Sequence, residues 1–144
     1  MTTSQLAAGY CKKCADRLAM LEVLMTRKAW SDVVRESQEI MELGLKGILR
    51  AVGIDPPKWH DVGSLLLEYS GKITQLSAGQ IRELAEASAL LRKEREFSFY
   101  GDVDFIPTDQ YDEADADRAF GYARQAAAAL EKVLMGLKPL QCGI

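Results

Sequence analysis

The feature that most restricts the fold is an amphipathic run from Trp30 to Val52. Apolar side chains recur there at intervals of three and four residues, and charged side chains occupy the positions between them. This spacing predicts an α-helix with one buried side. The run ends in helix-stopping residues, with Gly53 just past the last apolar position and Pro56 and Pro57 soon after. Because such a helix must bury its apolar side, other elements of the chain have to pack against it.

The same kind of pattern predicts three further long helices and one short helix. They cover about residues 4–28, 62–69, 77–100 and 112–136, and the short helix begins again at His60 or Asp61. Ser77 with Gln80 has the spacing of a capping box at the start of the fourth helix, and Asp112 with Asp115 repeats this spacing before the last one. Residues 102–111 are expected to form a loop.

The join between the first two helices is less defined. Residues 27–31 contain no Gly or Pro, so one unbroken helix stays open beside an antiparallel hairpin in which Ser31 or Asp32 caps the second helix. No segment alternates as a strand would. We therefore expect an all-α, up-and-down helical bundle of four long helices plus one short helix. It would form a single domain over residues 1–138, with a short tail at 139–144.

Composition narrows the classes of partner. The net charge is −3 and the pI is near 5.2, whereas broad binding to nucleic acid needs a basic surface. We expect no DNA binding, although a local basic pocket is compatible with this composition. The longest apolar runs are far shorter than a membrane span, and no signal-like start is present. These features predict a cytoplasmic protein without membrane association.

Two patterns in the sequence bear on a metal site. Cys11 and Cys14 have the spacing of half a zinc site, which Cys142 and His60 could complete, but a second CxxC or HxxxH pair is missing. Cys14 also falls on the line of residues predicted to face the core from the first helix, namely Leu6, Tyr10, Cys14, Leu18, Leu21 and Met25. The carboxylates between residues 102 and 117 are better explained by the helix dipole than by Mg²⁺. We expect no metal and no cofactor.

The end of the fourth helix carries the strongest candidates for a functional site. Arg95 continues the inward line of apolar positions, and an inward arginine needs a carboxylate or an anion. One interpretation is structural, with Arg95 paired to a carboxylate such as Glu42 and Tyr100 packed behind the loop. The other is functional, with Arg95 binding a phosphate while Tyr100 hydrogen-bonds or stacks on a base. His60 is the one histidine of the chain, so no mechanism based on two histidines within one chain is available.

Three segments together resemble the HEPN domains, the "higher eukaryotes and prokaryotes nucleotide-binding" family. They are SQEIMELGLKGILRAVGIDPPKWHDVGSLL at 37–66, REFSFYGD at 95–102 and YDEADADRAFGYARQ at 111–125. The likeness covers about Tyr10 to Leu134. It implies a five-helix bundle that usually dimerises, with the two fourth helices near the dimer axis and a basic cleft between them.

The resemblance also implies a chemistry, from which this chain departs. Many HEPN proteins are metal-independent ribonucleases or toxins, often paired with a minimal nucleotidyltransferase that silences them. Their shared signature is an Arg, four to six residues, and then a His. Here Arg95 is followed after four residues by Tyr100, and no histidine occurs after His60. Cleavage of RNA without a metal needs groups that exchange protons near neutral pH, and a tyrosine side chain ordinarily titrates near pH 10.

The sequence therefore favours a homodimer that binds a nucleotide or an RNA end over one that cleaves RNA. The candidate binding residues are Arg92, Arg95, Tyr100, His60 and Asp61, with Glu42 behind them. His60 and Asp61 would join this cleft only if the elbow after residue 53 folds back. A nucleotidyltransferase partner in a toxin–antitoxin-like system is compatible with this interpretation. The alternatives are an active metal-independent endoribonuclease toxin and a non-catalytic protein-interaction module.

Overall fold

The structure is a computed structural model that describes residues 3–56, 58 and 61–137. Its elements are α1 (Thr3–Thr26), α2 (Trp30–Ala51), α3 (Val62–Glu68), η1 (Ser70–Lys72), α4 (Ala78–Phe99), α5 (Pro107–Gln110) and α6 (Glu113–Leu137). The described part of the chain contains no strand, so the all-α class is confirmed. The expected loop at 102–111 was wrong in part, because it contains the short helix α5. Pro107 begins this helix, where its fixed φ suits the first turn and its missing N–H is not needed.

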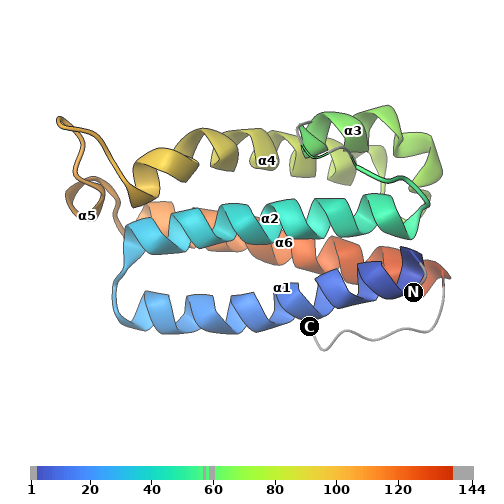
Figure 1. The fold of residues 1–144 in the computed structure, drawn as a ribbon, viewed down its shortest axis with the longest axis horizontal. Coiled ribbons are helices and arrows are strands. Elements are labelled where there is room, and N and C mark those ends of the chain that lie inside the picture. Colours follow the sequence, from blue (N-terminus) through green and yellow to red (C-terminus); the bar gives the residue numbers. More distant parts are fainter. Residues whose placement is uncertain (1–2, 57, 59–60, 138–144) are drawn as a thin grey trace.

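Helix α2 is the centre of the molecule. It packs against α1, α4 and α6, and also touches α3 and α5. Figure 1 shows the four long helices alternating in direction along the chain, so that α4 runs antiparallel to α2 and α6 runs alongside α2. Because α2 has neighbours on several sides, its burial extends beyond the predicted apolar line to Ser31, Gln38 and Gly47.

Close contact between α2 and α6 depends on small residues. A Cβ added to Gly44 would lie 3.1 Å from Cβ of Ala126, and one added to Gly47 would lie 2.6 Å from a methyl group of Leu130. Ala123, Ala126 and Ala127 are fully buried on α6. The buried side of α6 is thus a line of small and aliphatic residues that extends to Leu134, whereas Leu137 is exposed.

The first two helices form a hairpin rather than one continuous helix. Lys28 adopts φ of +58°, and the amides of Lys28 and Ala29 bond back to the carbonyl groups of Met25 and Leu24. The left-handed residue ends α1 and turns the chain. The expectation that Ser31 or Asp32 caps α2 was wrong, since α2 begins at Trp30 and its N-cap, Ala29, makes no side-chain cap bond.

The buried side of α1 differs from the predicted line. Ala7, Cys11, Cys14 and Leu21 are fully buried, whereas Tyr10 is only partly covered. The reason is that α1 lies against both α2 and α6, so the helix is covered over a wider arc than a single line of apolar residues. Both predicted capping boxes are confirmed, because Ser77 with Gln80 and Asp112 with Asp115 form reciprocal side-chain to backbone hydrogen bonds.

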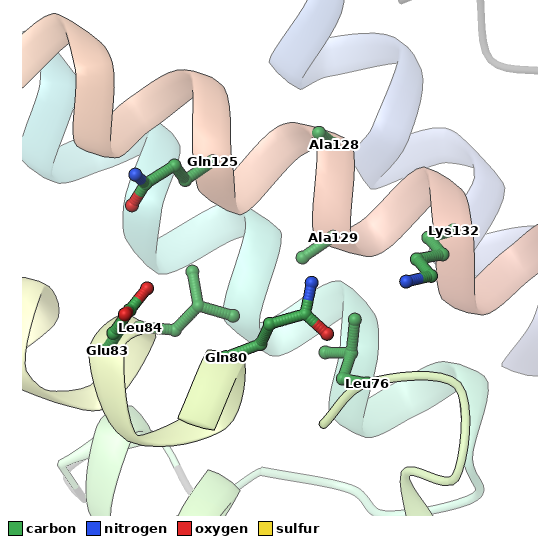
Figure 2. Close-up of a pocket in the computed structure, with 8 residues that line it drawn as sticks. All are labelled: Leu76, Gln80, Glu83, Leu84, Gln125, Ala128, Ala129 and Lys132. Carbon is green, nitrogen blue, oxygen red and sulfur yellow. The ribbon is translucent and has the colours of Figure 1, made fainter. Parts of the chain in front are cut away.

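Helices α4 and α6 touch each other much less than either touches α2. A pocket of about 270 Å³ opens between them, lined from α4 by Gln80, Glu83 and Leu84 and from α6 by Gln125 and Lys132 (Figure 2). No helix within the described ranges is both long enough and apolar enough to cross a membrane.

Candidate functional site

Arg95 is anchored to α2 by a carboxylate. Its Nη2 lies 2.7 Å from Oε1 of Glu39, and the two side chains are 45% and 29% exposed. Arg95 thus lies on the predicted inward line of α4. Because it is near the end of the helix, its side chain faces solvent rather than the core. Arg95 is therefore both held in place and accessible to a ligand.

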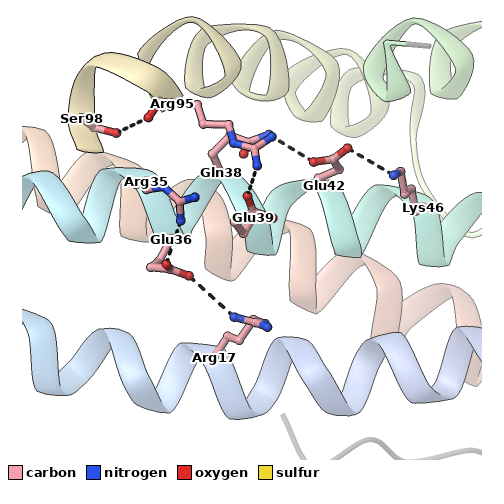
Figure 3. Close-up of polar contacts among 9 residues, drawn as sticks. All are labelled: Arg17, Arg35, Glu36, Gln38, Glu39, Glu42, Lys46, Arg95 and Ser98. Carbon is pink, nitrogen blue, oxygen red and sulfur yellow. Dashed lines mark hydrogen bonds and ion pairs between the residues drawn. The ribbon is translucent and has the colours of Figure 1, made fainter. Parts of the chain in front are cut away.

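Glu42 has a different role from the one expected. Its carboxylate pairs with Lys46 at 3.2 Å and accepts a long hydrogen bond of 3.5 Å from Nε2 of Gln38. Arg95 does pair with a carboxylate, as the structural interpretation states, but the partner is Glu39 rather than Glu42 because α4 and α2 are antiparallel. The last turn of α4 therefore lies nearer the start of α2, where Glu39 is one turn closer than Glu42 (Figure 3).

Arg92 and Asp61 meet although the chain separates them by 31 residues. Nη2 of Arg92 donates to Oδ1 of Asp61 at 2.6 Å. The elbow therefore does fold back, at Asp61, onto α4. Asp61 is also the N-cap of α3, where it accepts bonds from the amide of Gly63 and the hydroxyl of Ser64.

The environment of Asp61 favours its ionised form. Partial burial by itself raises the pKa of this carboxyl group. The hydrogen bond from Ser64, the charge of Arg92 and the amide of Gly63 outweigh that effect and hold the pKa below its usual value. The carboxylate thus fixes one side of the Arg92 guanidinium.

Tyr100 lies beyond the arginines, at the end of α4, and its side chain is 73% exposed. Its ring meets Phe99 edge to face at 4.9 Å between centroids, and the guanidinium of Arg35 lies 4.4 Å from the centre of the Phe99 ring. Among the described residues, no hydrogen bond, ion pair or ring contact joins Tyr100 to Arg95. The tyrosine is exposed as the functional interpretation requires, and it is not packed behind the loop.

Separate polar contacts lie on α2 beside the pair of Arg95 with Glu39, and one group of them reaches α1 (Figure 3). Arg35 pairs with Glu36 at 3.2 Å, and Glu36 lies 3.7 Å from Arg17 of α1. Together these ion pairs contain four cations, Arg17, Arg35, Lys46 and Arg95, and three carboxylates, Glu36, Glu39 and Glu42. This surface is nearly neutral, so its chemistry suits recognition of one or two phosphates rather than a long polyanion.

On the other side of α4, Tyr111 donates to Oε2 of Glu94 at 2.5 Å. Burial, together with the hydrogen bond to Glu94 and the charges of Glu94 and Asp115, raises the pKa of Tyr111 well above its usual value. The hydroxyl group therefore stays protonated and ties the segment after α5 to α4.

His60 and Cys142, two of the four residues considered as metal ligands, lie outside the described residues. The predicted binding role of His60 therefore also falls on a residue outside them. Within the described ranges, no group of three or more His, Cys, Asp or Glu side chains is placed to hold a metal ion. Burial raises the pKa of the Cys14 thiol to about 12, and its sulfur lies 3.8 Å from the Ile40 carbonyl oxygen. Cys14 is thus a core residue, as its helical position predicted.

Two contacts at this site, Arg95 with Glu39 and Arg35 with Phe99, were not predicted. Glu36 and Glu39 follow each other by one helical turn on α2, a spacing that indicates a shared exposed face and identifies Glu39 as a candidate partner. The contact between Arg35 and Phe99 has no such signal, because it joins residues 64 positions apart.

Comparison with known proteins identifies the family over nearly the whole chain. A model of the HEPN domain matches residues 7–133, which include every element from α2 to α5 and most of α1 and α6. No curated protein and no solved structure gives a significant match.

Proposed function

Because this chain belongs to the HEPN domain family, which is generally nucleotide- or RNA-related, we propose that it binds the phosphate of a nucleotide or of an RNA end at Arg95. Arg92 and Asp61 would border the site and Tyr100 would contact the base. The function proposed for the chain is binding, without cleavage of RNA.

The observation that carries this proposal is the state of Arg95. A guanidinium group has five N–H donors in a fixed plane, and the contact with Glu39 occupies one edge of it. The exposed remainder can donate two parallel bonds to a phosphate. Since Glu39 already fixes the side chain, a ligand would meet an arginine that has lost part of its rotamer freedom.

Tyr100 supports the same assignment. An exposed aromatic ring next to a phosphate-binding arginine is a suitable platform for stacking an unpaired base. Its ring is 73% exposed and rests edge to face on Phe99, so one surface of the tyrosine is available.

The absence of cleavage follows from the residue types. Hydrolysis without a metal needs a proton acceptor for the 2′-hydroxyl and a proton donor for the leaving oxygen. In the signature of the family that the sequence resembles, a histidine stands where this chain has Tyr100. The alternative, an active endoribonuclease, would need another group near Arg95 to exchange protons at neutral pH.

We further propose that the chain acts as a homodimer, joined near the ends of the two α4 helices. Pairing there would bring two copies of Arg95 into one cleft. The positive charge available to a phosphate would then be greater than on the nearly neutral surface of one chain. A minimal nucleotidyltransferase partner and a cytoplasmic location belong to the same proposal.

The experiment compares binding of a short 5′-phosphorylated RNA, the same RNA without the phosphate, and AMP. Arg95→Ala should weaken binding of the two phosphorylated ligands by about 1 to 3 kcal/mol, the contribution of a charge-assisted contact. Arg82→Ala is the matched control, because Arg82 is an exposed arginine of the same helix away from the site. Equal affinities for wild type and Arg95→Ala, or an equal loss in the control, would contradict the assignment.

A second variant tests the statement on catalysis. Tyr100→His restores the spacing of the family signature and should confer metal-independent cleavage of RNA if the cleft is otherwise intact. Cleavage by the unmodified protein, in the presence of EDTA and absent from Arg95→Ala, would show instead that the chain is an active ribonuclease.

A further inference from the structure

Three hollows between α4 and α6 form one continuous groove. The pocket of about 270 Å³ shares Glu83 and Gln125 with a second hollow of about 440 Å³. The second shares Leu90 and Tyr122 with a third of about 240 Å³, which reaches Tyr111. We call this continuous depression the α4–α6 groove.

The floor and the rims of the groove differ in chemistry. Apolar and small side chains line it, namely Leu76 just before α4, and Leu84, Ala87, Leu90, Leu91, Ala119, Ala128 and Ala129 from the two helices. Four carboxylates border it, namely Glu83, Glu86, Glu94 and Asp115, against two cations, Arg118 and Lys132. The groove is therefore apolar at its base and acidic overall.

The carboxylates in the middle of the groove are the ones without partners. Glu94 accepts the hydroxyl of Tyr111, and Asp115 caps α6 and lies 3.9 Å from Arg118. In contrast, Glu83 and Glu86 make no ion pair or hydrogen bond with any other residue in the described ranges, and both are exposed. Negative charge is thus available at the largest of the three hollows.

We propose that the α4–α6 groove is a docking surface for a basic amphipathic helix of a protein partner. From Gln80 to Glu94 the groove follows α4 for roughly 21 Å at the usual rise of an α-helix, which accommodates about four helical turns. Alanines on the floor let a helix approach closely, and apolar anchors at helical spacing would meet the leucines. Lysines or arginines on the flanks of the partner helix would meet Glu83 and Glu86.

Charge also decides against a second copy of the chain as the occupant. The chain carries a net charge of −3, and the groove itself holds more carboxylates than cations. A second copy would therefore meet electrostatic repulsion at this surface, whereas a basic partner is attracted to it. This inference is independent of phosphate binding, because the groove and Arg95 lie on different sides of α4.

The test uses the full chain and a labelled amphipathic peptide of about 18 residues built from leucine and lysine at helical spacing. A peptide with glutamate in place of every lysine is the charge control. We expect a one-to-one complex with the lysine peptide by fluorescence anisotropy and no detectable complex with the glutamate peptide.

Two sets of variants locate the complex. The double change Glu83→Lys with Glu86→Lys, and separately Ala128→Trp, should each weaken binding at least tenfold. The matched controls are Asp16→Lys with Glu68→Lys, and Ala19→Trp, because these residues are exposed on α1 and α3, away from the groove. Controls should bind as the wild type does.

Three results would overturn the proposal. They are an equal loss of affinity in the control variants, equal binding of the glutamate peptide, and conversion of a dimer to a monomer by Ala128→Trp, which would assign the groove to a second copy. Should Ala128→Trp fail to fold by circular dichroism, the charge-reversal pair decides the question alone.

Discussion

At the scale of single residues, the candidate site depends on how strongly Arg95 is tied to its surroundings. An arginine paired with a buried carboxylate would cost about 3 to 5 kcal/mol of stability when removed, because a charge would be stranded. Arg95 and Glu39 are both open to solvent, and exposed pairs typically contribute about 0 to 1 kcal/mol. We therefore expect Arg95→Ala to lower the free energy of unfolding by less than about 1 kcal/mol in urea titrations. A loss near 4 kcal/mol would restore the structural interpretation.

Asp61 gives a prediction on pH. Its pKa is lower in the folded protein than in the unfolded chain, where an aspartate titrates near 3.9. The unfolded chain therefore binds more protons around pH 4, and the stability due to Asp61 is complete above that value. It is lost as the pH falls through the lower folded value.

The measurement is the melting temperature of wild type and Asp61→Asn between pH 6 and pH 3. The wild type should be the more stable at pH 6, and the difference should shrink below about pH 4. A difference that stays constant over this range would show that the carboxylate charge of Asp61 does not stabilise the fold.

The same residues show how far sequence alone could go. Periodicity placed Arg95 on the inward line of α4, and the structure puts a carboxylate opposite it. Which carboxylate lies opposite Arg95 depends on the axial offset between the antiparallel helices α4 and α2. A shift of one turn places Glu39 rather than Glu42 opposite the arginine. Sequence spacing within α2 fixes the set of acidic residues but not this offset.

At the scale of elements, the glycines of α2 determine how closely α6 can approach. Leucine at position 44 would have to displace the backbone of Ala126, because even a Cβ atom would lie 3.2 Å from two of its main-chain atoms. Gly44→Leu should destabilise the protein by about 1 to 3 kcal/mol or more, the usual cost of overpacking. Gly9→Leu is the control, since Gly9 lies within α1 with open space around it and the change should be neutral or stabilising. Equal effects in thermal melts would mean that α2 and α6 are not in tight contact.

Elements governed by local chemistry were predictable, and those governed by packing were less so. The capping boxes at Ser77 and Asp112 involve residues three positions apart and appear as predicted. The break between α1 and α2 rests on Lys28 in a left-handed conformation, which glycine or asparagine would have signalled and lysine does not. Cys11 is fully buried although it lies off the apolar line that the pattern within α1 predicts.

At the scale of the whole molecule, the end of α4 and the following loop expose a group of apolar side chains. They are Phe97, Phe99, Tyr100, Val103 and Ile106, with exposures from 46% to 93%. Exposed aromatic residues of this kind are typical of a protein interface. The proposed dimer would cover the phenylalanines and aliphatic residues of this group and leave one face of Tyr100 open to a base.

Light scattering at micromolar concentration tests the dimer, which should have twice the chain mass of 15.9 kDa. Phe97→Glu should convert it to a monomer, because a charge would have to be buried without a partner. Val23→Glu, at an apolar residue of α1 that is 59% exposed, should leave the mass unchanged. A mass near 15.9 kDa for the wild type at every concentration would contradict the dimer.

The groove shows the limit of sequence at this scale. Its lining residues come from two helices, and the pattern of each helix predicts only which side is apolar. How far apart α4 and α6 lie depends on α2, which packs against both. Sequence therefore predicted the four long helices but not the space between two of them.

The loose contact between α4 and α6 also has a consequence for amide hydrogen exchange. Detaching α3 and α4 would uncover one side of α2 while the contacts among α1, α2 and α6 persist. Such a partial opening needs less free energy than complete unfolding, so amides inside α4 should exchange with deuterium sooner than those in the middle of α2. A partner helix seated between α4 and α6 would suppress this opening and slow exchange throughout α4. Exchange measured by mass spectrometry would then report occupancy of the groove without any label on the ligand.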